Sequence, residues 1–247
     1  MDKQYHINVS AKEIENSRYL IICGDPGRVP RISAQLKDPH EISFNREYRV
    51  HLGYLNDTPI LVSSCGIGAP STAIGIEEFG KLGVNTIIRV GTSGILSRDV
   101  KLGDLVSATG AIRDEGTTHE YILPAFPAVA HPDVIFALRE AVTHLNLQDR
   151  FHEGIVHSKD AFYSETPELI PDAVRAKNKW KVWINARTLI TEMECSTLFV
   201  ISYIRGWRAG GIMAAIGDTE SGELIIDHMK GQKEAIDVTI EAIKRLL

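Results

Sequence analysis

The chain has 247 residues, of which 44% are apolar, and a formal net charge of −5 at pH 7, so one α/β domain with a single large core is ordinary at this length. Without a basic surplus the protein is a poor candidate for binding a polyanion, and we expect no nucleic-acid partner. Residues 1–6 lack the apolar core of a secretion signal and the longest apolar runs are too short to span a bilayer, so we expect a cytoplasmic protein without a membrane partner.

Short β-branched runs alternate with helical patterns along the chain. The pattern predicts strands at residues 19–23, 60–63, 86–90, 104–108 and 211–215. It predicts helices at 29–36, 69–82, 131–145 and 194–206, and a final helix with one apolar stripe at Ile236, Ile240, Ile243 and Leu247. Strands separated by helices indicate a largely parallel or mixed sheet covered on both faces, with ligands beyond the carboxyl ends of the strands.

Residues 164–190 are the least regular part of the chain, polar and rich in Pro, Lys and Trp. No internal repeat or linker divides the sequence, so we expect one domain over residues 1–247. The segment 164–190 is then a flap or insert over a site rather than a second domain.

The three cysteines are an odd number, and none is spaced for zinc. Cys23 and Cys65 lie in strand-like surroundings, and Cys195 opens a helical pattern. We therefore expect buried, reduced thiols and no metal site.

Residues 24–28 (Gly-Asp-Pro-Gly-Arg) join the first predicted strand to a helical pattern. Glycine lets the backbone approach a ligand, a helix N-terminus offers free N–H groups, and Arg28 adds a fixed positive charge. This combination suits a phosphate-sized anion. From the motif alone, a plain strand-to-helix turn with a surface arginine is an equal alternative.

Arg89 lies at the end of a strand that has a buried pattern. An uncompensated buried charge is costly, so Arg89 must pair with a carboxylate or face an anionic ligand. Thr92 follows at a strand end bordered by Gly91 and offers a hydroxyl to the same anion. The alternative is a purely structural pair between Arg89 and a carboxylate.

Glu192 and Glu194 lie two residues apart before a helical pattern. In an extended segment both side chains point to one side, where a carboxylate can accept hydrogen bonds from a ribose cis-diol, and Met193 can pack against the sugar ring. The alternative is acidity that stabilises the start of a helix and has no other role.

Asp218 ends another apolar strand, where its carboxyl group could act as a general acid toward a leaving base or cap a turn. Phe162 and Tyr163 could stack on a base or fill the core. His6 and Arg46 carry no signal by themselves.

Seven short motifs follow one another in a specific order, at residues 24–28, 45–48, 66–71, 88–92, 126–130, 160–163 and 192–194. Together they resemble the nucleoside phosphorylase family, which includes uridine phosphorylases and hexameric purine nucleoside phosphorylases. The resemblance spans nearly the whole chain, from His6 to the C-terminal helix. It implies a single-domain, three-layer α/β fold with a central mixed β-sheet flanked by helices.

The resemblance implies roles residue by residue. Phosphate would be bound by Gly24, Arg28, Arg89 and Thr92. Ribose would be held by Glu192, Met193 and Glu194, and Phe162 would line the base pocket.

The family also implies an assembly, since its members form dimers that usually build hexamers. Arg46 would reach the phosphate of the partner subunit, and His6 would reach the ribose 5′-hydroxyl there. We therefore expect a homo-oligomer with sites shared across a dimer interface.

The implied reaction is phosphorolysis of a ribonucleoside to a free base and ribose 1-phosphate. The sugar passes through an oxocarbenium-like state, phosphate is held by arginines below the anomeric carbon, and the leaving base needs hydrogen bonding or a proton. Arg89, Glu194 and Asp218 are expected to carry the catalysis, with phosphate as co-substrate and no metal or organic cofactor. Arg28, Arg46 and Arg89 favour phosphate over water as the nucleophile.

Two features of the sequence disagree about the base. Residues 111–117 and the insert with Lys179 and Trp180 resemble uridine phosphorylases, which makes uridine the first expectation. Those enzymes read uracil with a glutamine and an arginine after the Phe-Tyr pair, whereas residues 164–171 contain neither. Glu165 can accept a hydrogen bond from uracil N3–H but cannot donate one to a carbonyl group.

Asp218 instead matches the aspartate with which the purine enzymes protonate the purine ring. A purine nucleoside (inosine, adenosine or methylthioadenosine) is therefore the alternative substrate. A non-catalytic nucleoside-binding protein is a third reading, which Arg28, Arg89 and Glu194 disfavour because such a protein has no need of a phosphate site.

Overall fold

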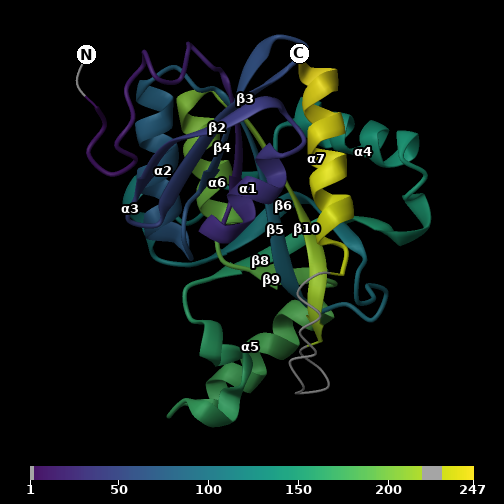
Figure 1. The fold of residues 1–247 in the computed structure, drawn as a ribbon. Coiled ribbons are helices and arrows are strands. Elements are labelled where there is room, and N and C mark those ends of the chain that lie inside the picture. Colours follow the sequence, from purple (N-terminus) through teal and green to yellow (C-terminus); the bar gives the residue numbers. More distant parts are fainter. Residues whose placement is uncertain (1–2, 219–229) are drawn as a thin grey trace.

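The computed structural model describes residues 3–218 and 230–247, and within these ranges ten strands form one mixed sheet with helices on both sides (Figure 1). The strands are β1 (Tyr19–Cys23), β2 (Lys37–Asn45), β3 (Tyr48–Leu55), β4 (Thr58–Ser64), β5 (Thr86–Ile95), β6 (Leu105–Asp114), β7 (Ala128–Val129), β8 (Phe151–Lys159), β9 (Ile190–Glu192) and β10 (Arg208–Asp218). The α-helices are α1 (Val29–Ser33), α2 (Ala69–Lys81), α3 (Thr117–Tyr121), α4 (Pro132–His144), α5 (Ala173–Asn185), α6 (Cys195–Arg205) and α7 (Gln232–Leu246). Short 3₁₀ helices are η1 (Pro26–Arg28), η2 (Gln148–Arg150), η3 (Phe162–Glu165) and η4 (Pro167–Leu169). None of the helices in these two ranges is long and apolar enough to cross a membrane.

The strand order brings several strand ends to one edge of the sheet. The order is β10-β6-β8-β9-β5-β1-β4-β3-β2, and β10 also pairs with β5, so that β10, β6, β8, β9 and β5 close into a ring. The strands β1, β4 and β5 are parallel, with Leu20 opposite Leu61 and Ile87. Because their carboxyl ends meet at the same edge, the loops that follow them are neighbours there.

Helices cover both faces of the sheet, as Figure 1 shows. Leu20 of β1 belongs to the core beneath α2 and α6, together with Phe79 and Phe199. The next residue, Ile21, belongs to the core beneath α4 and α7, together with Leu138. Successive residues of a strand face opposite sides, so β1 is buried on both, and the predicted three-layer α/β fold with a mixed sheet is confirmed.

The predicted strands and helices occur near the expected places, but the sequence pattern misses β2, β3, β7, β8 and β9. β2 is exposed along nearly its whole length, with Ser43 as its one buried residue. Such a strand shows no alternation of apolar and polar residues, which is the signal that predicts a half-buried strand.

The predicted helix at 29–36 is wrong in extent. After η1, α1 runs only from Val29 to Ser33. The side chain of Asp25 accepts a hydrogen bond from the backbone N–H of Gly27 at 2.8 Å, so the turn is already capped from within. A five-residue helix contributes little dipole, which leaves the charge of Arg28 as the main anion-attracting feature of this loop.

Segment 164–190 contains a regular helix, α5, which its composition does not predict. α5 buries only Ala176 and projects beyond the ends of β8 and β9, apart from the helices that cover the sheet (Figure 1). The indole N–H of Trp180 donates to the carbonyl oxygen of Ser164 at 2.7 Å and so fastens α5 to η3. The role of this segment as a flap stays a prediction.

All three cysteines are buried and free, as predicted. Burial raises the pKa of Cys23 and of Cys65 to about 12. Both side chains are therefore neutral thiols at pH 7, and neither is a nucleophile.

Candidate active site

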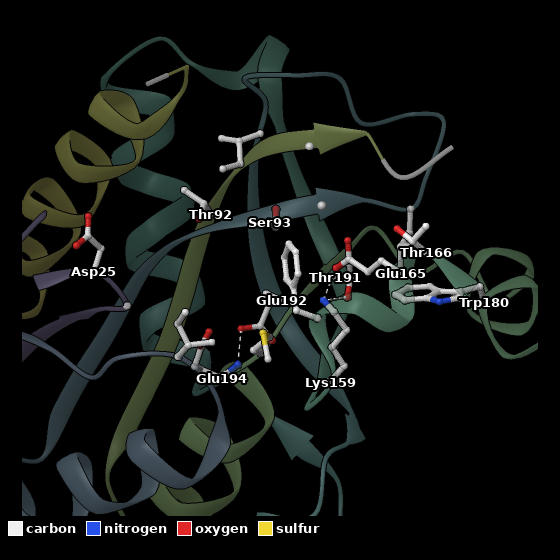
Figure 2. A pocket seen from close by; sticks show the side chains of 18 of the residues that line it. Asp25, Thr92, Ser93, Lys159, Glu165, Thr166, Trp180, Thr191, Glu192 and Glu194 are labelled. Atoms are coloured by element: carbon white, nitrogen blue, oxygen red, sulfur yellow. Dashed lines mark hydrogen bonds and ion pairs between the residues drawn. The ribbon is translucent and has the colours of Figure 1, made fainter. Parts of the chain in front are cut away.

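A cavity of about 1250 Å³ lies beyond the carboxyl ends of the parallel strands. The loops after β1, β4 and β5 and the end of β10 form one side of it, and η3 and α5 form another (Figure 2). Nine of the site residues expected from the sequence line this cavity: Gly24, Arg28, Arg89, Thr92, Phe162, Glu165, Glu192, Met193 and Glu194. The fold therefore gathers residues that are far apart in the chain into one site.

Arg89 of β5 is buried between two carboxylates. Its Nε lies 3.3 Å from Oε2 of Glu192, and its Nη2 pairs with Oε2 of Glu194. Burial opposes the charge of the guanidinium, but the two carboxylates together raise the pKa of Arg89. A Cβ on Gly91 would lie 3.0 Å from Nη2 of Arg89, so a larger residue at position 91 would crowd the guanidinium group. The structural pair is thus present, and it fixes the guanidinium at the cavity.

Arg89 still has donor capacity for a ligand. Its Nη1 is buried and has no hydrogen-bond partner among the described residues. A buried donor without a partner is costly, and Arg89 lines the cavity, so we expect an anion bound there to supply the missing acceptor. The structural and the anion-binding readings of Arg89 are therefore compatible.

Glu192 and Glu194 differ in their hydrogen-bond partners. Glu192 accepts hydrogen bonds from the backbone N–H groups of Glu194 and Cys195, each at 2.9 Å, and from the hydroxyl of Ser158. It therefore caps the start of α6 and holds Arg89, as the helix-start alternative proposed. Glu194 has one backbone contact, from the N–H of Gly68 at 2.8 Å, besides its pair with Arg89. Of the two carboxylates, Glu194 keeps more acceptor capacity for a ribose hydroxyl.

Burial also affects the charge of Glu194. It raises the pKa of the Glu194 carboxyl group above its usual range, although the charge of Arg89 opposes the shift. Because Glu192 and Glu194 share the one guanidinium group of Arg89, the second arginine of the cavity gains importance for an anionic ligand.

Arg28 is that second arginine. Within the described residues, the guanidinium group of Arg28 makes one long hydrogen bond, from Nη1 to the carbonyl oxygen of Val90 at 3.5 Å. Partial burial lowers the pKa of Arg28, and the nearby charge of Arg89 adds to the effect. Two guanidinium groups that share a cavity, one of them without a carboxylate partner within residues 3–217 and 230–247, suit the binding of an anion.

Lys159 is a cavity residue that the sequence analysis missed. It ends β8, is only 4% exposed, and lies in the cavity with its ammonium 2.5 Å from Oε1 of Glu165 and 2.9 Å from the hydroxyl of Thr191. Figure 2 shows the three side chains pointing toward one another. An ammonium has three N–H donors, so two acceptors within the described residues leave one donor for a ligand.

Phe162 lies beside this ion pair. The ammonium of Lys159 is 5.9 Å from the centre of the Phe162 ring, and the indole of Trp180 lines the same part of the cavity. A flat group bound here would meet aromatic surface together with one N–H donor and one carboxylate acceptor. The sequence does carry one signal for Lys159 as a site residue: it is a lysine in a strand-like run, three residues before Phe162.

Three expected site residues fall outside this arrangement. His6 and Arg46 do not line the cavity; the backbone and ring of His6 are held by Glu78. Arg46 lies 5.9 Å from the ring centre of Tyr5, next to His6. Asp218 ends β10 directly after cavity residue Gly217, but its side chain lies outside the described part of the structure.

Comparison with known proteins identifies the family of the chain. Residues 18–247 match the model of a family described as the phosphorylase superfamily. The chain belongs to the phosphorylase superfamily. It is 42% identical over 249 residues to a uridine phosphorylase of Treponema pallidum (strain Nichols), with 100% of this chain and 95% of the relative covered. It is 41% identical to a uridine phosphorylase of Thermococcus kodakarensis (98% and 86% covered) and 37% identical to a guanosine phosphorylase of Halorubrum lacusprofundi (94% and 88% covered).

Among the described residues of this phosphorylase-superfamily chain, no group of three or more His, Cys, Asp or Glu side chains is arranged to hold a metal ion. The charged groups that line the cavity include the guanidinium groups of Arg28 and Arg89, the buried ammonium of Lys159, and the carboxylates of Glu165, Glu192 and Glu194. Groups of these types bind phosphate, hydroxyl groups and the polar edge of a base by charge and hydrogen bonding.

Proposed function

We propose that this protein is a nucleoside phosphorylase, a pentosyltransferase that uses inorganic phosphate to cleave uridine into uracil and ribose 1-phosphate. One observation carries the proposal: a single cavity holds Arg28, which has no carboxylate partner among the described residues, and the buried pair of Lys159 and Glu165 beside Phe162. The first feature suits an anion, and the second suits the polar edge of a base. Similarity over the whole chain to relatives named uridine phosphorylase supports it.

The chemistry follows from how charge moves in the reaction. Arg28 and the free Nη1 of Arg89, with Gly24 and Thr92 nearby, hold phosphate below the anomeric carbon, where its charge stabilises the oxocarbenium-like sugar. Glu194 accepts hydrogen bonds from the ribose hydroxyls. Phosphate is itself the nucleophile, and we expect no metal or organic cofactor to take part.

The base is read by a donor and an acceptor. Uracil presents carbonyl oxygens on both sides of N3–H; Lys159 donates to a carbonyl and Glu165 accepts from N3–H. The ammonium also stabilises the negative charge that uracil gains as the bond breaks. Cytosine has an unprotonated N3 and an amino group at this edge, which mismatches the pair and is rejected.

Guanosine is the second candidate. A 6-oxopurine presents the same neighbouring carbonyl and N–H groups as uracil, and a relative 37% identical to this chain is named guanosine phosphorylase. For a purine, Asp218 would act as the acid toward the ring nitrogen. Adenosine lacks the carbonyl group and is expected to be a poor substrate.

We further propose that the protein is a cytoplasmic homo-oligomer, most simply a hexamer built from three dimers. His6 and Arg46 lie together with Tyr5 but away from the cavity of their own chain. A second copy that brings its cavity to these residues would give Arg46 a phosphate and His6 a ribose hydroxyl.

A substrate panel tests the proposed specificity. Uridine, cytidine, guanosine, inosine and adenosine are each incubated with the protein, with and without phosphate, and the free base is quantified. We expect phosphate-dependent release of uracil to exceed that of guanine and hypoxanthine, with little cytosine or adenine. Dominant release of a purine would make guanosine-type cleavage the function, and base release independent of phosphate would contradict phosphorolysis.

Arg28→Ala is expected to raise the KM for phosphate about tenfold or more, because a charge-assisted hydrogen bond to the anion is lost. The KM for uridine should change little. Initial rates at varied phosphate measure the effect, with Arg205→Ala as control, since Arg205 pairs with Glu77 at the surface. An unchanged phosphate KM would remove Arg28 from the anion site.

A further inference from the structure

Behind Lys159 lies a buried chain of hydrogen bonds that reaches the surface. The ammonium of Lys159 donates to Oγ1 of Thr191 at 2.9 Å, and Oγ1 of Thr191 lies 3.1 Å from Nδ1 of His157. Nε2 of His157 lies 2.8 Å from Oδ2 of Asp114, whose other oxygen lies 2.5 Å from Nζ of Lys179. Lys159, His157 and Thr191 are 4%, 2% and 1% exposed, so water does not compete for these bonds.

The strand geometry produces this chain. His157 and Lys159 are two residues apart on β8, so their side chains leave the same face of the strand. Thr191 of β9 is the direct neighbour of His157 in the parallel pair of strands. The hydroxyl of Thr191 is thereby placed between the imidazole and the ammonium.

With a neutral imidazole at His157, the donors and acceptors fit in one direction. Thr191 accepts from the ammonium of Lys159, so its single hydroxyl hydrogen is free to be donated to Nδ1 of His157. The proton of a neutral imidazole then lies on Nε2 and is donated to Asp114. Hydrogen bonds from His157 and Lys179 lower the pKa of Asp114, although burial opposes the shift, so a carboxylate acceptor is present at the end of the chain.

We propose that Thr191 and His157 are positioning residues that hold the ammonium of Lys159 at the nucleobase. Without them, Lys159 would keep Glu165 as its partner but lose the second contact that fixes the direction of its free N–H. This inference rests on the proposed function, in which Lys159 reads a carbonyl group of uracil. Neither His157 nor Asp114 lines the cavity, so their effect on the base passes through Thr191 and Lys159.

The alternative to the positioning role is that these hydrogen-bonded side chains serve only to hold α5 against the sheet. His157 packs against Trp180 and Trp183 of α5, with ring centres 5.2 and 5.6 Å apart, and Lys179 of α5 pairs with Asp114. The hydroxyl of Thr191 takes no part in these contacts. Its removal therefore separates the positioning role from the fastening role.

The test compares Thr191→Val, which removes the hydroxyl at nearly constant volume, with Thr191→Ser, which keeps it. We expect Thr191→Val to lower kcat/KM for uridine about tenfold, as for loss of one hydrogen bond to a charged group, with the KM for phosphate unchanged and activity recovered in Thr191→Ser. Thr188→Val is the matched control, because the hydroxyl of Thr188 is equally buried and has no partner within the described residues. In a Lys159→Met background, Thr191→Val should cause no further loss.

A second readout does not depend on turnover. Hydrogen exchange of the Lys159 ammonium, followed by ¹⁵N NMR and assigned from the signal missing in Lys159→Met, should be slow in the wild type and in Thr191→Ser and faster in Thr191→Val and His157→Leu. Failure of the proposed function would show as absent uridine cleavage with this exchange pattern intact. Unchanged exchange in Thr191→Val, or faster exchange with unchanged kcat/KM for uridine, would overturn the positioning role.

Discussion

Arg89→Ala is expected to abolish phosphorolysis, with a fall in kcat/KM of more than about a hundredfold. The substitution removes a guanidinium that faces the anion, and loss of one preorganised charge partner of a transition state typically costs this much. It also leaves Glu192 and Glu194 buried without their cation, so the added negative charge would repel phosphate. The measurement is initial rate against phosphate and uridine for the wild type and the variant.

The same substitution is expected to lower stability, because breaking one side of a buried ion pair costs about 3–5 kcal/mol. Arg89→Lys separates the two effects: it keeps a cation for the carboxylates but loses the forked geometry that reaches both them and a ligand. We expect Arg89→Lys to stay folded by thermal unfolding and still lose activity at least about tenfold. Near-wild-type rates in either variant would refute the role of Arg89 in the reaction.

Lys159→Met should lower kcat/KM for uridine about a hundredfold or more, since a buried cation that meets the charge developing on uracil is lost. The KM for phosphate should not change. Steady-state kinetics with each substrate varied in turn measures this split.

Lys177→Met is the matched control for Lys159→Met. Lys177 also lines the cavity, but its side chain is 55% exposed and pairs with Glu168. Its replacement should leave uridine cleavage within about twofold, as expected for an exposed ion pair worth under 1 kcal/mol. Equal losses in the two variants would mean that positive charge in general, rather than the buried pair of Lys159 and Glu165, supports the reaction.

The spacing of apolar residues along the sequence predicts many of the helices and strands. The buried strands β1, β4 and β5 and the helices α2, α4, α6 and α7 are dense in apolar residues, so their spacing predicts them. β2 and α5 have almost no buried residues, and their conformation depends on contacts with other parts of the chain. No local pattern predicts such elements.

Within the site, the sequence predicted which residue types would gather but not how they pair. Arg89 was expected either in a structural pair or at a ligand, and the structure shows the pair with a donor left over. Glu192 was expected at ribose, yet its oxygens are engaged by the start of α6. Such pairs form because β5, β8 and β9, which are far apart in the sequence, lie side by side in the sheet. The spacing of residues along the sequence does not predict which side chains meet there.

Lys159 is a second example of what the sequence does not predict. Residues 164–171 contain neither the glutamine nor the arginine that the resemblance to uridine phosphorylases implies for binding uracil. The donor that we propose, Lys159, comes instead from the end of β8, and its ammonium lies 2.5 Å from Oε1 of Glu165. The pairing of Lys159 with Glu165 is visible only in the distance between their side chains.

The most direct test of the account is ³¹P NMR of the protein incubated with uridine and inorganic phosphate, with uracil quantified in the same sample. We predict a sugar phosphate signal of ribose 1-phosphate that grows in proportion to uracil, and no uracil when phosphate is left out. Uracil that appears with free ribose, and without loss of inorganic phosphate, would contradict the account, because water rather than phosphate would then be the nucleophile.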